Sequence, residues 1–145
     1  MGSLNLPASG PVYLDTNSFI YSVERIEPYY SLLSPLWSAA SSGQFEIVSS
    51  ELVLLETLVK PFRAQDGLLA DLYRNLYRSR EVRLIPATAL LWEQAAELRA
   101  RIVGLKTPDA LHAATALDCG SKVFLTNDNK FRQIPNLQVE LLGLI

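Results

Sequence analysis

Short runs of strand-forming residues alternate with longer segments whose apolar residues recur at helical spacing, and this alternation most constrains the fold. The runs are 12–14, 45–48, 82–85 and 123–125, with a fifth candidate at 137–141. The segments between them carry apolar residues every three to four positions, as on one face of an amphipathic helix. Strands that alternate with helices form right-handed crossovers, so the sequence predicts a parallel sheet of four to five strands covered on both faces.

The expected helices are bounded by ordinary starting and ending residues. The first begins after Asp15 and ends by Pro28, and the second spans about 29–42, where Pro35 should kink or restart it. Further helices are expected from 52 to Pro61 and over 64–80, 88–103 and 110–119, the last with Thr107 as its N-cap and deep in the fold. The helix 64–80 carries apolar stripes, at Leu68, Leu69, Leu72 and Leu76 and at Tyr73 and Tyr77.

The chain has 145 residues, of which 49% are hydrophobic, and these values predict one domain with a buried core. We expect residues 11–145 to form this single domain and residues 1–10 to be a disordered or artificially added lead. The lead contains no Lys or Arg and no apolar core of a signal peptide. No apolar stretch approaches the ~20 residues that a membrane span needs, so we expect a cytoplasmic protein without a membrane partner.

The scarcity of cysteine and histidine limits the chemistry. Cys119 and His112 are single residues of their types, which excludes an internal disulfide framework and any site that needs two histidines. We expect Cys119 to pack as a small hydrophobe and His112 as a hydrogen-bonded core residue. A net charge of −2 excludes an obvious polycationic nucleic-acid binder. It does not exclude an enzyme that approaches nucleic acid through bound cations.

Four carboxylates are the candidates for chemistry. Asp15 and Asp128 follow expected strands, and the carboxyl ends of parallel strands meet at one edge, where ligands gather. Glu56 lies about two turns into the helix after the second strand. Asp109 lies in the first turn of a helix that precedes the fourth strand, so its spacing leaves open which edge it reaches. A converging set of carboxylates repels itself, and Mg²⁺ or Mn²⁺ is the counter-ion that suits oxygen ligands.

Three ordered motifs resemble those of PIN-domain nucleases. They are V-Y-L-D-T-N at 12–17, K-T-P-D-A-L-H-A-A-T-A at 106–116, and F-L-T-N-D at 124–128 followed by Phe131. The segment 50–61 resembles the part of that family that supplies a further acid, with Glu56 as the best match and Glu51 as the alternative. The resemblance extends over nearly all of residues 11–141. It implies a three-layer α/β/α sandwich in which Asp109 does reach the site.

The resemblance also implies an activity and the residues that carry it. The expected activity is Mg²⁺- or Mn²⁺-dependent endoribonuclease hydrolysis of RNA. The implied acidic quartet is Asp15, Glu56, Asp109 and Asp128. Asp15 and Asp109 would ligate the metal, while Glu56 and Asp128 would ligate a second ion, hold metal-bound water or act as base. Thr126 would orient the site by hydrogen bonds, and Asn17 would support the first motif.

Many small members of this family are VapC-like toxins, so the resemblance implies an RNA substrate and an antitoxin partner. The apolar surface near Tyr29, Tyr30 and Trp37 is the candidate antitoxin dock. A homodimer is also expected, for which the stripe of Tyr73 and Tyr77 is a candidate surface. The alternative function is a PIN-like protein- or RNA-binding module with a weak or silent site.

A modest basic cluster adds one hypothesis about RNA binding. Arg74 and Arg78 lie one turn apart on an expected helix, and Arg80 and Arg83 follow soon after. An ordinary solvated helix face explains them equally well. The hypothesis is that Arg74 and Arg78 contact phosphates of the substrate.

Overall fold

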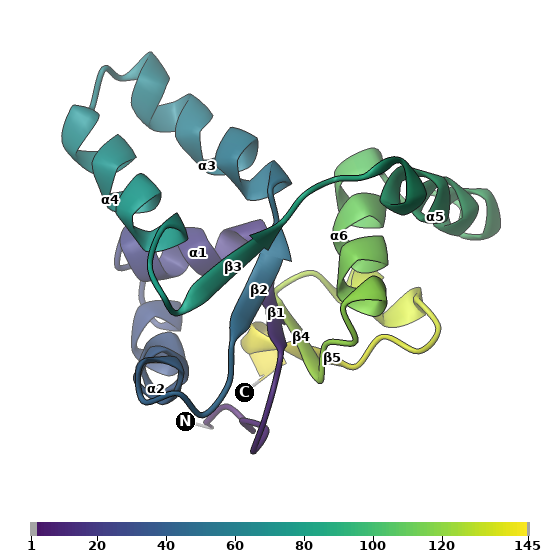
Figure 1. The fold of residues 1–145 in the computed structure, drawn as a ribbon, viewed down its shortest axis with the longest axis horizontal. Coiled ribbons are helices and arrows are strands. Elements are labelled where there is room, and N and C mark those ends of the chain that lie inside the picture. The colour runs from purple at the N-terminus through teal and green to yellow at the C-terminus, as the bar shows by residue number, and fades with distance from the viewer. Residues whose placement is uncertain (1–2, 145) are drawn as a thin grey trace.

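The computed structural model describes residues 3–144 and contains a five-stranded sheet in which every paired strand is parallel to its neighbour. The strand order is β3-β2-β1-β4-β5. The strands are β1 (Val12–Leu14), β2 (Ile47–Ser50), β3 (Val82–Ile85), β4 (Val123–Thr126) and β5 (Val139–Leu141). The predicted three-layer α/β/α sandwich with a parallel sheet is confirmed (Figure 1).

Helices cover both faces of the sheet (Figure 1). One face carries α1 (Thr16–Val23), α2 (Tyr29–Ser41), α3 (Leu52–Arg63) and α4 (Gly67–Tyr77). The other face carries α5 (Ala89–Arg101), α6 (Thr107–Asp118) and the short 3₁₀ helix η1 (Asn129–Gln133), and a second 3₁₀ turn, η2 (Leu142–Leu144), follows β5.

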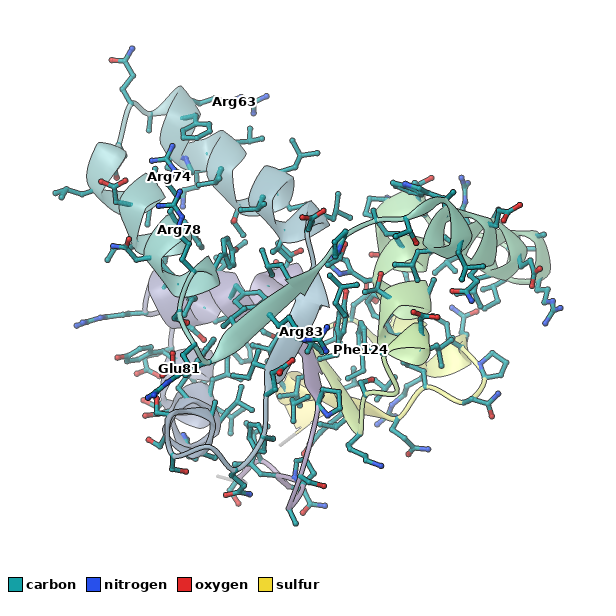
Figure 2. The ribbon with its side chains drawn as sticks, in the orientation of Figure 1. Arg63, Arg74, Arg78, Glu81, Arg83 and Phe124 are labelled. Carbon is teal, nitrogen blue, oxygen red and sulfur yellow. The ribbon has the colours of Figure 1, made fainter. Side chains whose placement is uncertain are left out.

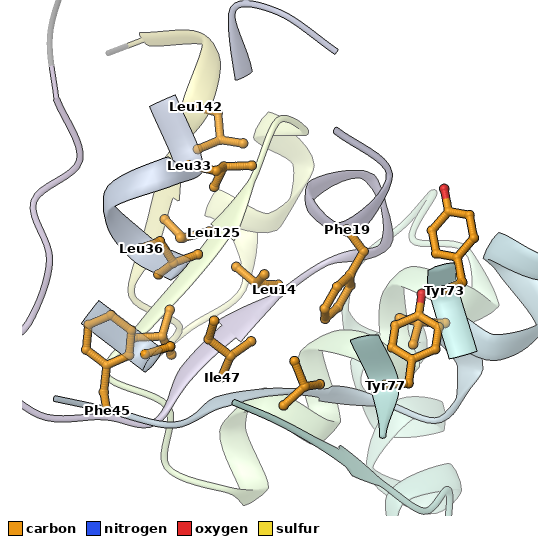
Figure 3. Packing of buried hydrophobic residues seen from close by; sticks show 14 residues of the cluster. Leu14, Phe19, Leu33, Leu36, Phe45, Ile47, Tyr73, Tyr77, Leu125 and Leu142 are labelled. Atoms are coloured by element: carbon orange, nitrogen blue, oxygen red, sulfur yellow. The ribbon is translucent and has the colours of Figure 1, made fainter. Parts of the chain in front are cut away.

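Two buried clusters lie on the two faces of the sheet because successive strand residues point to opposite sides. In β1, Val12 and Leu14 belong to the cluster under α1–α4, whereas Tyr13 belongs to the cluster under α5 and α6. Figure 3 shows the first cluster, in which Phe19 of α1 and Leu33 of α2 pack toward the strands. This double burial explains why β1 reads as a continuous apolar run.

Two prolines lie inside continuous helices. The helix does not restart at Pro35, and the helix expected to end at Pro61 continues beyond it. Pro35 lies inside α2, and Pro61 lies inside α3, which continues to Arg63. A proline costs an intrahelical hydrogen bond, but buried side chains on either side of it oppose the break. In α2 these are Leu33 and Leu36. Tertiary packing therefore outweighs local propensity in both helices.

Several expected boundaries were wrong by a few residues. The second strand covers 47–50 instead of 45–48, because Ser49 donates its hydroxyl to the Leu14 carbonyl at 2.7 Å and so satisfies a buried polar group. The helix expected at 64–80 begins only at Gly67, after Asp66 caps the Leu69 amide at 3.0 Å. Thr107 is not the N-cap of α6, because its hydroxyl accepts a hydrogen bond from Arg99 instead.

The tyrosines of α4 are part of the chain's own core. Tyr73 and Tyr77 are buried, and their hydroxyls bond to Glu24 at 2.5 Å and to Thr57 at 2.8 Å. Their stripe is therefore not available as the surface of a homodimer, which corrects that part of the prediction. Leu72, expected in an apolar stripe, is exposed, as is Leu68.

The segment before β1 forms neither helix nor strand over residues 3–10. Leu4 and Leu6 pack against the first cluster, and Gln44 donates a hydrogen bond of 2.8 Å to the Pro7 carbonyl. Residues 1 and 2 of the expected lead, and residue 145 of the expected domain, lie outside the described residues. No helix within residues 3–144 is long and apolar enough to cross a membrane.

Candidate active site

The first and last of the predicted acids lie at the carboxyl ends of two adjacent strands. Asp15 follows β1 directly, and Asp128 comes two residues after β4. The two strands pair in parallel with Leu14 opposite Leu125, and the Asp15 amide donates to the Leu125 carbonyl at 3.3 Å. Sheet pairing therefore fixes the main chain on which both acids stand.

The other two acids lie near the starts of helices that return across the sheet. Glu56 stands on α3, which follows β2, and Asp109 stands in the first turn of α6. The chain enters β4 just after α6, and the main-chain amide of Lys122 donates to the carbonyl of Pro11 at the amino end of β1. The end of α6 therefore lies at the amino edge of the sheet, so its start, with Asp109, lies toward the carboxyl edge (Figure 1).

Asp15 is a buried carboxylate with a full set of donors. Its Oδ1 accepts from the Ser18 amide at 3.1 Å and from the Ser18 hydroxyl at 2.9 Å, and its Oδ2 accepts from the Thr126 hydroxyl at 2.6 Å. Burial raises the pKa of Asp15 because desolvation disfavours the charged form, while the bonds from Thr126 and Ser18 oppose the rise. A nearby cation would favour its ionised form.

Thr126 connects two of the acids through one hydroxyl group. Its Oγ1 donates to Asp15 and accepts from the Asp128 amide at 3.0 Å. The Asp128 carboxylate turns the other way, and its Oδ1 accepts from the Lys130 amide at 2.9 Å as the N-cap of η1. The position of Asp128 thus depends both on Thr126 and on the following turn.

Glu56 lies in a network of three other side chains. Its Oε1 accepts from the Thr16 hydroxyl at 2.6 Å and lies 2.9 Å from Nε2 of His112. The opposite ring nitrogen, Nδ1 of His112, is 2.7 Å from the Tyr13 hydroxyl. Burial acts to raise the pKa of Glu56, but the hydrogen bonds from His112 and Thr16 and the His112 charge outweigh it, so the pKa is lowered.

Asp109 experiences the charges of two other acids. Burial raises its pKa first, and repulsion from Asp128 and, more weakly, from Glu56 raises it further. His112 and Lys130 act in the opposite direction. The charges of Glu56 on α3 and Asp128 after β4 therefore both reach the Asp109 carboxylate on α6.

Two predicted residues lie apart from this network. Glu51 is exposed and begins α3 without a side-chain cap bond. Asn17 is also exposed, and Ser18, not Asn17, donates to Asp15. Thr16 and Ser18 were not predicted as site residues. The Asp15 N-cap itself is a signal that its carboxylate accepts from an amide of the next turn, here that of Ser18. His112 is buried and hydrogen-bonded as predicted, but one of its partners is Glu56.

The expected basic cluster is divided between two elements. Figure 2 shows Arg74 on α4 and Arg78 at the C-terminal cap of α4, whereas Arg83 lies on β3. Arg74 donates to Asp71 at 3.0 Å and its guanidinium lies 5.3 Å from the centroid of the Phe62 ring. Arg83 pairs with Glu46. Phosphate binding by Arg74 and Arg78 stays a prediction.

The donor chemistry of the acids suits a hard divalent cation, because carboxylate oxygens are the ligands that Mg²⁺ and Mn²⁺ prefer. The raised pKa of Asp109, caused by burial and by Asp128, is the kind of repulsion that a cation relieves. Among residues 3–144, no three His, Cys, Asp or Glu side chains are yet arranged to hold an ion. Direct coordination of one ion by three of these side chains would therefore require them to draw closer together.

The sequence matches the model of one protein family. The family is the PIN domain, and the match covers residues 12–137. This range includes all four predicted acids. No curated protein matches the chain.

Several solved structures share the fold. VapBC2 from Rickettsia felis, bound to a DNA fragment from its promoter, is 25% identical with a TM-score of 0.68, and the match covers 90% of this chain and 97% of that one. VapC20 from Mycobacterium tuberculosis, a sarcin-ricin loop cleaving toxin, is 22% identical with a TM-score of 0.70, covering 84% and 93%. A toxin–antitoxin complex from Klebsiella pneumoniae is 20% identical with a TM-score of 0.64, covering 87% and 94%.

Proposed function

The chain belongs to the PIN domain family, and on that premise we propose that it is a Mg²⁺- or Mn²⁺-dependent endoribonuclease. The observation that carries the proposal is the mutual influence of the acids. Asp109 has a pKa raised by burial and by the charges of Asp128 and Glu56, while the neighbouring strand ends hold Asp15. Such repulsion is costly for a purely structural role, and it is the expected signature of a site that binds cations.

The proposed division of work follows the environments of the acids. Asp15 and Asp109 would hold the metal ion directly, and Glu56 and Asp128 would hold it through water or hold a second ion. A bound ion of this kind lowers the pKa of a coordinated water and neutralises charge on the phosphate. Thr126 and Ser18 fix both oxygens of Asp15, so this carboxylate is oriented before substrate arrives.

Glu56 has a different proposed role from Asp109, because their pKa values move in opposite directions. Thr16 and His112 keep Glu56 ionised, so it suits orienting water or a cation by accepting hydrogen bonds. A carboxylate with a lowered pKa is a weak proton acceptor. Asp109, whose pKa is raised by burial and by the Asp128 charge, would be held in its ionised form by the cation that it ligates.

We also propose that the protein is the toxin of a toxin–antitoxin pair. The similar structures include a toxin–antitoxin complex and a toxin that cleaves the sarcin-ricin loop. A pocket of about 360 Å³ between α1, α2 and α4 supports a partner site, with Tyr30, Trp37, Leu72 and Leu76 on its walls. Tyr29 of the predicted dock instead stacks on Tyr21, with ring centroids 4.4 Å apart. An amphipathic antitoxin segment is the occupant that this apolar pocket suits.

Homodimerisation remains part of the proposal, through a surface other than the buried tyrosines of α4. Exposed apolar side chains on the outer helices supply the alternative. They are Leu55 and Phe62 on α3, Leu68 on α4, and Leu90 and Trp92 on α5. Sedimentation of the purified chain over a range of concentrations tests the state directly.

Cleavage of a mixed RNA pool tests the activity. Wild type is compared with Asp15→Asn and Asp109→Asn in Mg²⁺, in Mn²⁺ and in EDTA. Asp118→Asn is the matched control, because Asp118 is an exposed acid at the far end of the helix that carries Asp109. We expect metal-dependent cutting by wild type and by the control, and its loss in the other two variants. Equal cutting by all four proteins would identify a contaminating nuclease.

The alternative function is a binding module with a weak or silent site. It predicts a folded protein that neither cuts RNA nor gains stability from millimolar Mn²⁺, because a ligand that binds the native state must stabilise it. Cutting that depends on Asp15 and Asp109 would exclude this alternative.

A further inference from the structure

A second pocket includes one of the four predicted acids, Asp128. Its volume is about 540 Å³, which lies within the range of ordinary small-molecule sites. We call it the amide pocket, and the residues that line it are Asn17 and Tyr21 of α1, Asn127, Asp128 and Asn129 after β4, and Leu141 and Gly143 at the end of the chain. Asp128 belongs both to this pocket and to the predicted acidic quartet, so a molecule in the pocket lies next to the proposed cleavage site.

The lining determines what kind of group the pocket accepts. It presents three side-chain amides and one phenol, and none of the described residues that line it is basic. Asp128 is the charged side chain among the lining residues, so the lining itself offers a phosphate no positive partner. A neutral group with a row of hydrogen-bond donors and acceptors is favoured, because each amide offers both.

The amide of Asn127 is held in place before any ligand arrives. Its Nδ2 donates to the Tyr21 hydroxyl at 3.4 Å, and the Tyr21 ring is in turn stacked on Tyr29. On the other side, a Cβ added at Gly143 would lie 2.7 Å from Asn127 Oδ1, so a side chain at position 143 would displace the Asn127 amide. A polar group that is already held in place binds a ligand more tightly than a mobile one, because it loses little conformational entropy on binding.

We propose that the amide pocket binds one base of single-stranded RNA beside the scissile phosphate, and that Asn127 reads the edge of that base. The inference rests on the proposed ribonuclease function and adds the source of its sequence preference. Unpaired bases in RNA are recognised by hydrogen bonds to their edges and by aromatic contacts, and the pocket supplies amides and the Tyr21 side chain. The phosphate next to that base would then lie toward the acids.

The test is sequencing of the ends that the protein generates from a random-sequence, single-stranded RNA pool in Mn²⁺. Wild type should favour one base at one position beside the cut. Asn127→Ala should reduce that preference by about tenfold, the order expected for losing a bidentate base contact. Gly143→Ala, which forces Asn127 to move, should reduce it as well. Tyr21→Phe removes the hydroxyl that holds Asn127 and serves if either other variant fails to fold.

The control is Asn75→Ala, because Asn75 is an exposed amide on α4 that does not line the pocket. It should retain the wild-type preference. Cutting by wild type without any base preference, or an unchanged preference in Asn127→Ala and Gly143→Ala, would overturn this inference and leave the ribonuclease function standing. An equal loss of cutting at every sequence in Asn127→Ala would also overturn it. No cutting by wild type would overturn the proposed function and this inference with it.

Discussion

Glu56 and His112 are 56 positions apart in the sequence, yet Oε1 of the glutamate lies 2.9 Å from Nε2 of the histidine. The histidine is buried, and its other nitrogen is engaged with Tyr13, whose ring lies flat against Phe124 under α6. A continuous set of contacts therefore leads from the second core cluster to a predicted active-site carboxylate. We infer that His112 is a positioning residue, which acts through Glu56.

Substitutions of His112 should distinguish the effect of its contact with Tyr13 from that of its contact with Glu56. His112→Ala leaves a cavity and a buried Tyr13 hydroxyl without its partner, so the free energy of unfolding should fall by about 2–4 kcal/mol. His112→Asn keeps an amide toward Tyr13, and His112→Gln places one toward Glu56. Both should be more stable than the alanine variant, but the glutamine variant should retain more RNA cleavage. Equal kcat values for the two amide variants would contradict the positioning role.

The stability of the protein should depend on the ionisation of Glu56. Because its pKa is lowered in the folded state, the ionised form adds stability above its ordinary value of 4.5, and this stability is lost as the pH falls through the folded value. Between pH 7 and pH 3, wild type should therefore lose more stability than Glu56→Gln. The measurement is urea unfolding in EDTA at each pH.

A second glutamate on the same helix provides the control for that experiment. Glu51 is exposed and lies at the start of α3, so Glu51→Gln should leave the pH dependence of wild type unchanged. If the curves of wild type and Glu56→Gln run parallel, the network of Thr16, His112 and Glu56 does not stabilise the charge.

Divalent cations should stabilise the protein in a manner that depends on pH. A concentration of Mn²⁺ one hundred times its Kd adds about 2.7 kcal/mol to the free energy of unfolding. Burial raises the pKa values of both Asp15 and Asp109, so protons compete with the ion, and the Mn²⁺-induced rise in Tm should be smaller at pH 5 than at pH 7.5.

The contribution of Asp109 to that effect is measurable by substitution. Asp109→Asn should reduce the rise in Tm with Mn²⁺, and Asp118→Asn should retain it. A rise of equal size in both variants would place the ion elsewhere. No rise in wild type at either pH would support the silent binding module.

Substitutions of two leucines on α4 distinguish antitoxin binding in the pocket from a general effect of added surface charge. Leu72 lines the pocket between α1, α2 and α4, whereas Leu68, one turn earlier and 83% exposed, does not. Leu72→Asp should weaken binding of a candidate antitoxin at least tenfold and leave RNA cleavage unchanged. Leu68→Asp should change neither, as measured by co-purification and cleavage assays. Weaker binding in both variants would contradict docking in this pocket.

The central strands were predictable from the sequence because β1 and β4 are largely buried and therefore read as continuous apolar runs. The edge strand β3, which carries the exposed Arg83, was still located within one residue from its strand-forming residues and Pro86. The second strand was less predictable, since Ser49 and Ser50 are polar and enter the sheet through tertiary hydrogen bonds. The continuation of α2 through Pro35 and of α3 through Pro61 depends on tertiary burial, which the local sequence does not contain.

The candidate site was predictable in part. Spacing alone placed Asp15 and Asp128 at one edge, but left Asp109 open. A helix that connects parallel strands runs opposite to them, so its first turn lies at the carboxyl edge, and this rule could have settled the position of Asp109. The contacts of Glu56 with Thr16 and His112 join three separate segments, and no local pattern carries that information.

The end of α6 lies at the opposite edge of the sheet from the acids, and this separation has a practical use. Gly120, with φ of +68°, and Ser121 form a short surface turn between α6 and β4. Surface turns of this kind tolerate insertions and chemical attachment, since few packing contacts depend on their length. A fluorophore or affinity handle placed there would lie at the edge of the sheet opposite the acids and leave the edge that carries them unobstructed.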